Sequence, residues 1–200
     1  MLKKLMIILA LSGSLFAMHD VELDLNDYDL DAQLNLDLGQ FNDAVDPDTA
    51  FLGARYLRAS SEHSDDDLTH DENLYDIHFF VKQRLHGTPD LTLGLGTKLV
   101  FTSVENEDFT ALPIGALVDY ELPLGLSIPF ILGGSFYYSP QVLSWQDAKN
   151  YMEVEGHLDV RVIDRASITA GYRKIDTDFD TALDDVVFNE AWFIGVKFRF

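Results

Sequence analysis

Long stretches of this 200-residue chain alternate between apolar and polar side chains with a period of two. The closing segment, EAWFIGVKFRF, places its large apolar residues on one face and Lys197 and Arg199 on the other. This period is typical of a β-strand, whose successive side chains point to opposite faces of a sheet. The chain is therefore predicted to be all-β. Besides 190–200, the predicted strands cover 21–25, 30–38, 50–59, 73–84, 91–101, 111–121, 126–138, 151–162 and 166–175.

Several of these strands have about 10–13 residues, whereas about 5–6 is usual in globular proteins and about 9–11 tilted residues cross a bilayer. Short connections at 85–90, 122–125 and 163–165 alternate with longer polar ones at 60–71, 103–110, 139–150 and 176–187. This arrangement is typical of an antiparallel up-and-down membrane barrel. Eight strands fit between 50 and 200, and a hairpin within 18–49 raises the number to ten. We favour ten strands, with eight plus an N-terminal appendage as the alternative.

The polar faces decide between a membrane barrel and a soluble periplasmic β-sandwich. Basic and acidic residues nearly balance there, although the whole chain has a formal charge of −20 and its excess acid lies in the loops. A narrow lumen requires such balance, because unpaired ions in a low-dielectric interior cost several kcal/mol each. We therefore predict a transmembrane β-barrel with apolar residues facing lipid. The predicted lumen charge network consists of Arg55, Lys98, Asp119, Glu153, Glu155, Asp159, Arg161, Arg173, Lys197 and Arg199.

The N-terminus is predicted to be a cleaved signal peptide, residues 1–17, with a short basic start, an apolar run and a small residue at its end. Residues 18–200 would then form one barrel domain, an N-terminal hairpin in 18–49 followed by an eight-strand meander in 50–200. Acidic residues and prolines interrupt the best candidate for a membrane-spanning helix, 111–136. So acidic a chain is not expected to bind nucleic acid. These features predict export to the outer membrane.

Two blocks in the C-terminal third carry a family resemblance. They are Phe136-Tyr-Tyr-Ser-Pro140, followed by Leu143-Ser144, and Ser167-Ile-Thr-Ala-Gly-Tyr-Arg173. This succession resembles the YfaZ family of outer-membrane proteins of Gram-negative bacteria. The resemblance implies a location and an architecture, and it implies no activity. The last strand also resembles the sorting signal of bacterial barrels, which implies contact with the outer-membrane assembly machinery. The residues of this assembly signal are Trp192, Val196, Phe198 and Phe200.

His157 lies between Glu155 and Asp159 on one face of a predicted strand. The trio is interpreted as a structural charge ladder that pairs with Arg161 and Lys98, rather than as a catalytic site. An outer-membrane lipid hydrolase would need a nucleophile beside a histidine. Candidates on the polar face are Ser135, Ser167 and His78, but no motif distinguishes them. We expect no enzymatic activity, with the lipid hydrolase as an alternative.

The acidic loops suggest that the protein binds divalent cations, which prefer several carboxylate oxygens as ligands. Thr181 and Val187 occupy the places where the twelve-residue calcium loop requires Gly and Glu, so weak capture at the cell surface is the only cation role considered. The alternative is that these loops are simply solvated. No other cofactor is expected. The candidate ligands are Asp65, Asp67, Asp176, Asp178 and Asp180.

A ten-stranded barrel has a slim interior, here narrowed further by Leu117, Ile131 and Phe193. We therefore expect a structural protein of the envelope, or a surface-interaction protein, that is embedded as a monomer in outer-membrane lipid and lipopolysaccharide. A narrow channel for ions or small solutes is the main alternative.

Overall fold

The computed structural model describes residues 19–26, 28–60, 71–104, 107–179 and 185–200. Within them, ten strands form a closed antiparallel β-barrel. Neighbouring strands pair in chain order, and β1 pairs with β12 to close the wall. The barrel strands are β1 (Asp20–Leu25), β2 (Leu30–Asp37), β3 (Ala50–Ser60), β4 (Asp71–Leu85), β5 (Thr88–Val104), β7 (Ile114–Glu121), β8 (Phe130–Ser139), β10 (Ala148–Ile163), β11 (Ala166–Phe179) and β12 (Asp185–Arg199).

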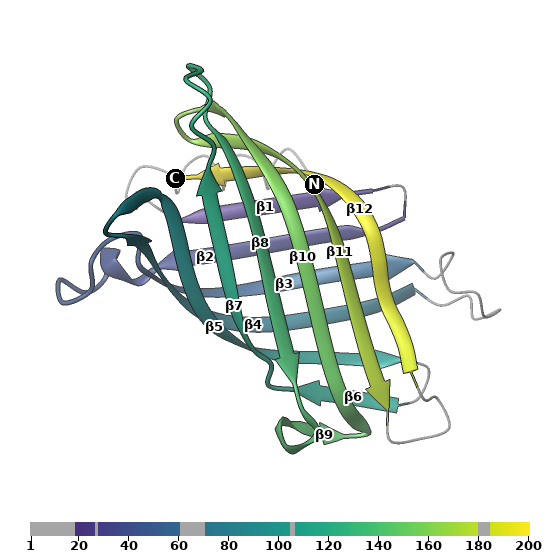
Figure 1. Ribbon diagram of the computed structural model, residues 1–200. Helices are drawn as coiled ribbons and strands as arrows, with labels where there is room; N and C mark the ends of the chain where they lie inside the picture. Colours follow the sequence, from purple (N-terminus) through teal and green to yellow (C-terminus); the bar gives the residue numbers. More distant parts are fainter. Residues whose placement is uncertain (1–18, 27, 61–70, 105–106, 180–184) are drawn as a thin grey trace, which may run out of the picture.

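The prediction of a ten-stranded barrel is confirmed, and the N-terminal hairpin belongs to the wall. Figure 1 shows strands β8, β10 and β11 crossing in front of β1 to β4 at a steep angle, as expected when tilted strands close into a barrel. The chain ends support the closure, because His19 and Phe200 exchange two backbone hydrogen bonds of 2.9 Å. No helix among the described residues is long and apolar enough to cross a membrane.

The two ends of the barrel differ. At one end, here called the terminal end, lie residues 19 and 200, the turns after β4, β7 and β10, and the connection 38–49 with the 3-10 helix η1 (Leu38–Gln40). The opposite end, here called the loop end, carries a small sheet beyond the wall. There β6 (Glu107–Ala111) pairs with β5 and with β9 (Ser144–Gln146), which follows the 3-10 helix η3 (Gln141–Leu143).

This small sheet corrects part of the prediction. The segments 103–110 and 139–150 were expected to be loops, but they contain most of β6 and all of β9. The backbone of β6 pairs with that of β5, and the backbone of β9 pairs with that of β6. The predicted strand 111–121 begins only at Ile114, after Pro113. The predicted strand 126–138 begins only at Phe130, after Pro129. Both shifts have the same cause, since proline lacks the N–H that a ladder hydrogen bond needs.

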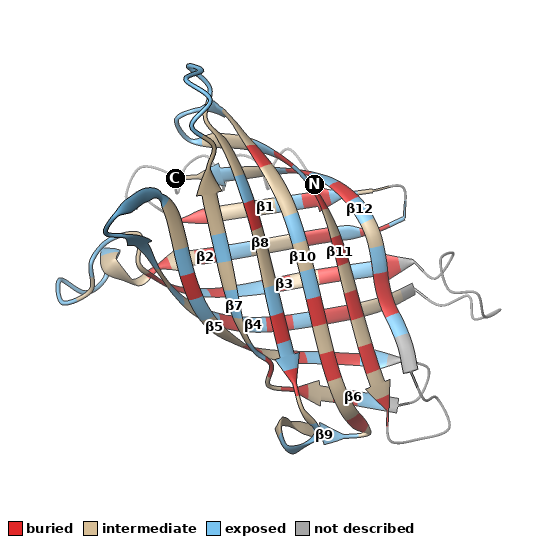
Figure 2. Cartoon of the chain, viewed as in Figure 1, coloured by how far each residue is buried: buried red, intermediate tan, exposed pale blue. Residues whose placement is uncertain are grey.

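The alternation of faces follows the sequence. Figure 2 shows buried and exposed residues alternating along the strands. Trp192 and Ile194 on β12 point outward and are 75% and 66% exposed, whereas Arg173 on the paired strand β11 is 1% exposed. The barrel is thus apolar outside and charged inside, which is the arrangement of a membrane barrel rather than of a soluble sandwich.

An apolar plug fills the lumen towards the loop end. It includes side chains from the loop-side halves of the wall strands and two from β6. The Phe109 ring lies 5.4 Å from that of Phe179 and 6.1 Å from that of Tyr151, measured between centroids. β6 therefore contributes apolar side chains to the plug. The plug consists of Leu57, Ala59, Leu74, Val100, Phe109, Ala111, Ala148, Tyr151, Ile175, Phe179 and Phe188.

Candidate functional site: a charged lumen with one open end

A buried ion cluster lies below the plug. Arg55 Nε lies 2.9 Å from Asp31 Oδ2, and Arg55 Nη1 lies 2.5 Å from Glu153 Oε1. Lys98 Nζ donates to the other oxygen of Glu153 at 2.7 Å, and Arg173 pairs with Asp31. These contacts join strands on opposite sides of the barrel. The ion cluster consists of Asp31, Arg55, Asp76, Lys98, Glu153 and Arg173.

Two neighbours fix this cluster in place. Tyr151 of the plug donates its hydroxyl to Glu153 at 2.8 Å. His78 contacts Asp76 through Nδ1 at 2.6 Å and Asn35 through Nε2 at 2.7 Å. Both ring nitrogens of His78 are therefore engaged within a structural network, which disfavours the use of this histidine as a general base.

Nearer the terminal end, a lysine and a histidine each lie between two carboxylates. Lys197 Nζ is 3.1 Å from Glu22 and 3.4 Å from Asp159. His157 is 3.4 Å from Glu155 through Nδ1 and 3.8 Å from Asp119 through Nε2.

Glu155, His157 and Asp159 were expected from the sequence to pair with Lys98. This expectation is wrong, because Lys98 lies deeper and bonds Glu153. Arg161, the other expected partner, lines the cavity described below. Arg199, at the mouth, pairs with Asp20 at 3.0 Å.

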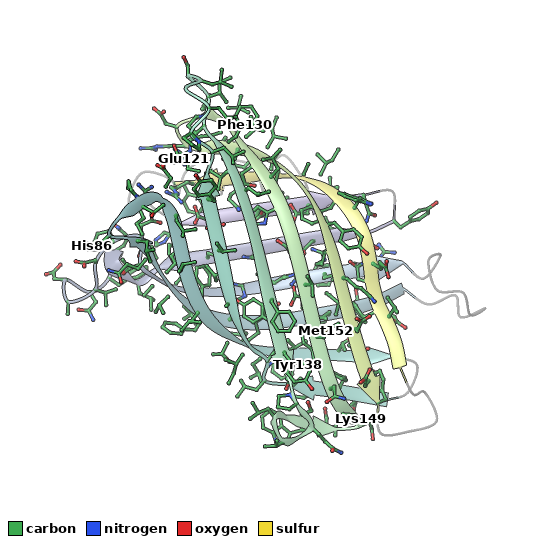
Figure 3. All side chains as sticks on the ribbon, viewed as in Figure 1. His86, Glu121, Phe130, Tyr138, Lys149 and Met152 are labelled. Carbon is green, nitrogen blue, oxygen red and sulfur yellow. The ribbon has the colours of Figure 1, made fainter. Side chains whose placement is uncertain are left out.

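A polar cavity of about 660 Å³ occupies the lumen from the ion cluster to the terminal end. Arg55, Lys98 and His78 line it, as do Lys197 and His157 with their four carboxylate neighbours. Ser135 and Ser167 line it too. Figure 3 shows Glu121, a lining residue, at the end of β7 on the terminal side, whereas Lys149 lies towards the loop end.

Sequence reasoning missed the acidic residues that β1 and β2 contribute. Asp20, Glu22 and Asp24 occupy the polar positions of β1, and Asp31 on β2 binds two arginines. The signal was present, because these acids alternate with Val21 and with two leucines. The prediction described this hairpin by its apolar face and assigned it no part in the lumen.

Two of the predicted cation ligands, Asp176 and Asp178, lie in the described part of the chain. Asp176 lies 3.3 Å from Lys174 Nζ, and Asp178 accepts a hydrogen bond of 2.9 Å from Asn150. Asp65, Asp67 and Asp180 lie outside the described residues. Within the described part of the chain, no group of three or more acids and histidines is placed to hold a metal ion. Cation capture by the acidic loops stays a prediction.

Three residues of the predicted assembly signal, Trp192, Val196 and Phe198, share the outer face of β12, whereas Phe200 follows the strand and its ring lies 6.0 Å from that of His19. Trp192 and Phe198 are exposed, as is Val196 at 37%. The Trp192 ring lies 5.2 Å from that of Tyr172 on β11. A role for these residues in assembly stays a prediction.

The closed wall, the apolar exterior and the charged lumen define a small outer-membrane-type β-barrel. The family model described as YfaZ precursor matches residues 13–200. The chain belongs to this family, as the resemblance predicted.

Two solved structures are similar to this chain. One, described as "Unveiling the Mechanism Behind the in-meso Crystallization of Membrane Proteins", is 10% identical, with 92% of this chain and 83% of that chain covered and a TM-score of 0.38. The other is OmpT, an outer membrane protein of Vibrio cholerae, which is 11% identical, with 90% of this chain and 64% of OmpT covered and a TM-score of 0.33. No curated protein matches the chain.

Proposed function

We propose that this protein is a non-enzymatic barrel of the bacterial outer membrane that serves envelope integrity or surface interaction. The observation that supports this role is the filling of the lumen. The ion cluster and the apolar plug lie one above the other, and both consist of buried side chains. A barrel filled in this way offers lipids and partners its outer wall and its loops rather than an open pore.

The orientation in the membrane follows from the connections. Outer-membrane barrels place short turns in the periplasm and longer loops outside the cell. The loop end would therefore face outward, with the acidic stretches 65–67, 105–108 and 176–185. Divalent cations could bridge these carboxylates to the phosphates of lipopolysaccharide. The partners proposed are lipopolysaccharide, bulk outer-membrane lipid and, during biogenesis, the assembly machinery. The protein acts as a monomer.

Conductance separates this role from that of a channel. The purified protein, inserted into a planar bilayer, is expected to give no discrete current steps above the empty membrane. A double variant in the plug, Phe109→Ala with Phe179→Ala, serves as the positive control, because it removes two rings that contact each other inside the bore. Regular steps from the unmodified protein would contradict the proposal.

A narrow channel is the second candidate. The polar cavity favours it, because the cavity already extends from the terminal end as far as the ion cluster. Conduction would still require the plug to move. A lipid hydrolase has less support, because the hydrogen bonds of His78 to Asp76 and Asn35 leave neither ring nitrogen to activate a serine.

A further inference from the structure

The cavity at the terminal end has the size of a ligand site. Its volume of about 660 Å³ lies in the range of small-molecule pockets, roughly 300–1,000 Å³. Most such pockets are largely apolar, whereas this one carries charges of both signs on side chains fixed by rigid strands. Its chemistry should therefore select a polar ligand.

Carboxylates outnumber basic groups in the part of the cavity around Lys197 and His157. Glu22 and Asp159 lie beside Lys197, and Asp119 and Glu155 lie beside His157. The contacts of His157 are long, so Glu155 and Asp119 keep oxygens able to accept further hydrogen bonds. This part of the cavity suits an ammonium group.

The inner end of the cavity offers the opposite group. The side chain of Arg55 is 2% exposed and lines the cavity. Its Nε and Nη1 atoms bond Asp31 and Glu153, but its Nη2 atom has no hydrogen-bond partner among the described residues. A buried guanidinium N–H without an acceptor is destabilising, and a carboxylate is its best partner.

We propose that this cavity binds a small zwitterion bearing an amine and a carboxylate, the chemistry of amino acids and short peptides. The ammonium group lies against Glu155 and Asp119, and the carboxylate accepts from Arg55. Binding follows from the lining alone, whereas access from the periplasm rests on the orientation proposed above.

Three four-carbon probes test the assignment by isothermal titration calorimetry on the folded protein in detergent. They are 4-aminobutanoate, 1,4-diaminobutane and butanedioate, which carry both groups, only ammonium groups, and only carboxylates. The expected result is that 4-aminobutanoate binds at least about tenfold more tightly than either of the others, since each lost charge-assisted hydrogen bond removes about that much affinity. No detectable binding of 4-aminobutanoate, or equal binding of a comparator, would overturn the proposal.

Two variants locate the site. Glu155→Gln and Asp119→Asn should each weaken 4-aminobutanoate binding about tenfold. Glu190→Gln is the matched control, because Glu190 is exposed and bonds Tyr172 on the outer face. Each variant is first shown to fold by its heat-dependent gel mobility, and either lumen variant suffices if the other does not fold. Unchanged affinity in a folded lumen variant would also overturn the proposal. If the bilayer recording shows no current steps and calorimetry shows no binding of 4-aminobutanoate, this inference is overturned and the proposed function still stands.

Discussion

Lys98 Nζ lies 2.7 Å from Glu153 Oε2, although β5 and β10 do not pair and are separated in the wall by β7 and β8. Glu153 also accepts hydrogen bonds from Arg55 on β3 and from Tyr151 on its own strand. One carboxylate thus joins three parts of the wall across the lumen. Its negative charge offsets the positive charges of two buried side chains, Lys98 and Arg55.

Substitution of this carboxylate should be costly. Glu153→Gln leaves Arg55 and Lys98 buried with less opposing charge, and we expect the free energy of unfolding to fall by about 3–5 kcal/mol. Urea unfolding in lipid vesicles, followed by tryptophan fluorescence, measures the loss. Asp176→Asn is the control, because its partner Lys174 is partly exposed and a surface pair contributes only about 0–1 kcal/mol. Equal losses in the two variants would contradict the structural role of the ion cluster.

A charge on the outer face should destabilise the barrel only where hydrocarbon surrounds it. Ile194→Arg places a guanidinium on the exposed middle of β12, and we expect a loss of about 2–4 kcal/mol in lipid. Leu126→Arg is the control, because Leu126 is similarly exposed but lies in the connection between β7 and β8 at the terminal end. The same unfolding assay compares them. Similar stability of both variants would indicate that the outer face meets water.

The absence of a side chain at Gly133 leaves room in the lumen for neighbouring side chains. A Cβ added at Gly133 would collide with the His157 ring and lie 2.6 Å from Asp119 Oδ1, whereas one added at Gly156 would meet no atom of the described residues within 4 Å. We therefore expect Gly133→Ala to lose about 1–3 kcal/mol of unfolding free energy and Gly156→Ala to be nearly neutral.

Adding His157→Ala should recover part of the Gly133→Ala loss in a double-mutant cycle. If the two alanine variants proved equally stable, or if the second substitution gave no recovery, the packing described for this wall would be wrong.

The sequence predicted which way each strand faces, because a period of two leaves only two choices and the charges of the polar face decide between them. Leu95 points outward and Lys98 inward, as expected. The number of strands was also predictable, since the alternation in β1 and β2 is as regular as in the other strands.

The partners inside the lumen were not predictable. Which residues meet across a barrel depends on the stagger of strands that are distant in the sequence, and Lys98 therefore reaches Glu153 rather than the stretch around His157. The strands β6 and β9 were missed for another reason. Their sequences, EDFTA and SWQ, are short and polar, and only their pairing with β5 and with each other makes them strands.

The central claim is that apolar side chains meet lipid and charged side chains meet the lumen. The chain has no cysteine, so single spin labels can be attached to Leu95→Cys and Ile194→Cys on the outer face and to Ser135→Cys in the cavity. The most direct measurement is the accessibility of these labels, in lipid vesicles, to oxygen and to a water-soluble nickel chelate. We expect oxygen to relax the two outer labels and the nickel chelate to be excluded from them, with the reverse at Ser135. Strong relaxation of the outer labels by nickel would contradict the account.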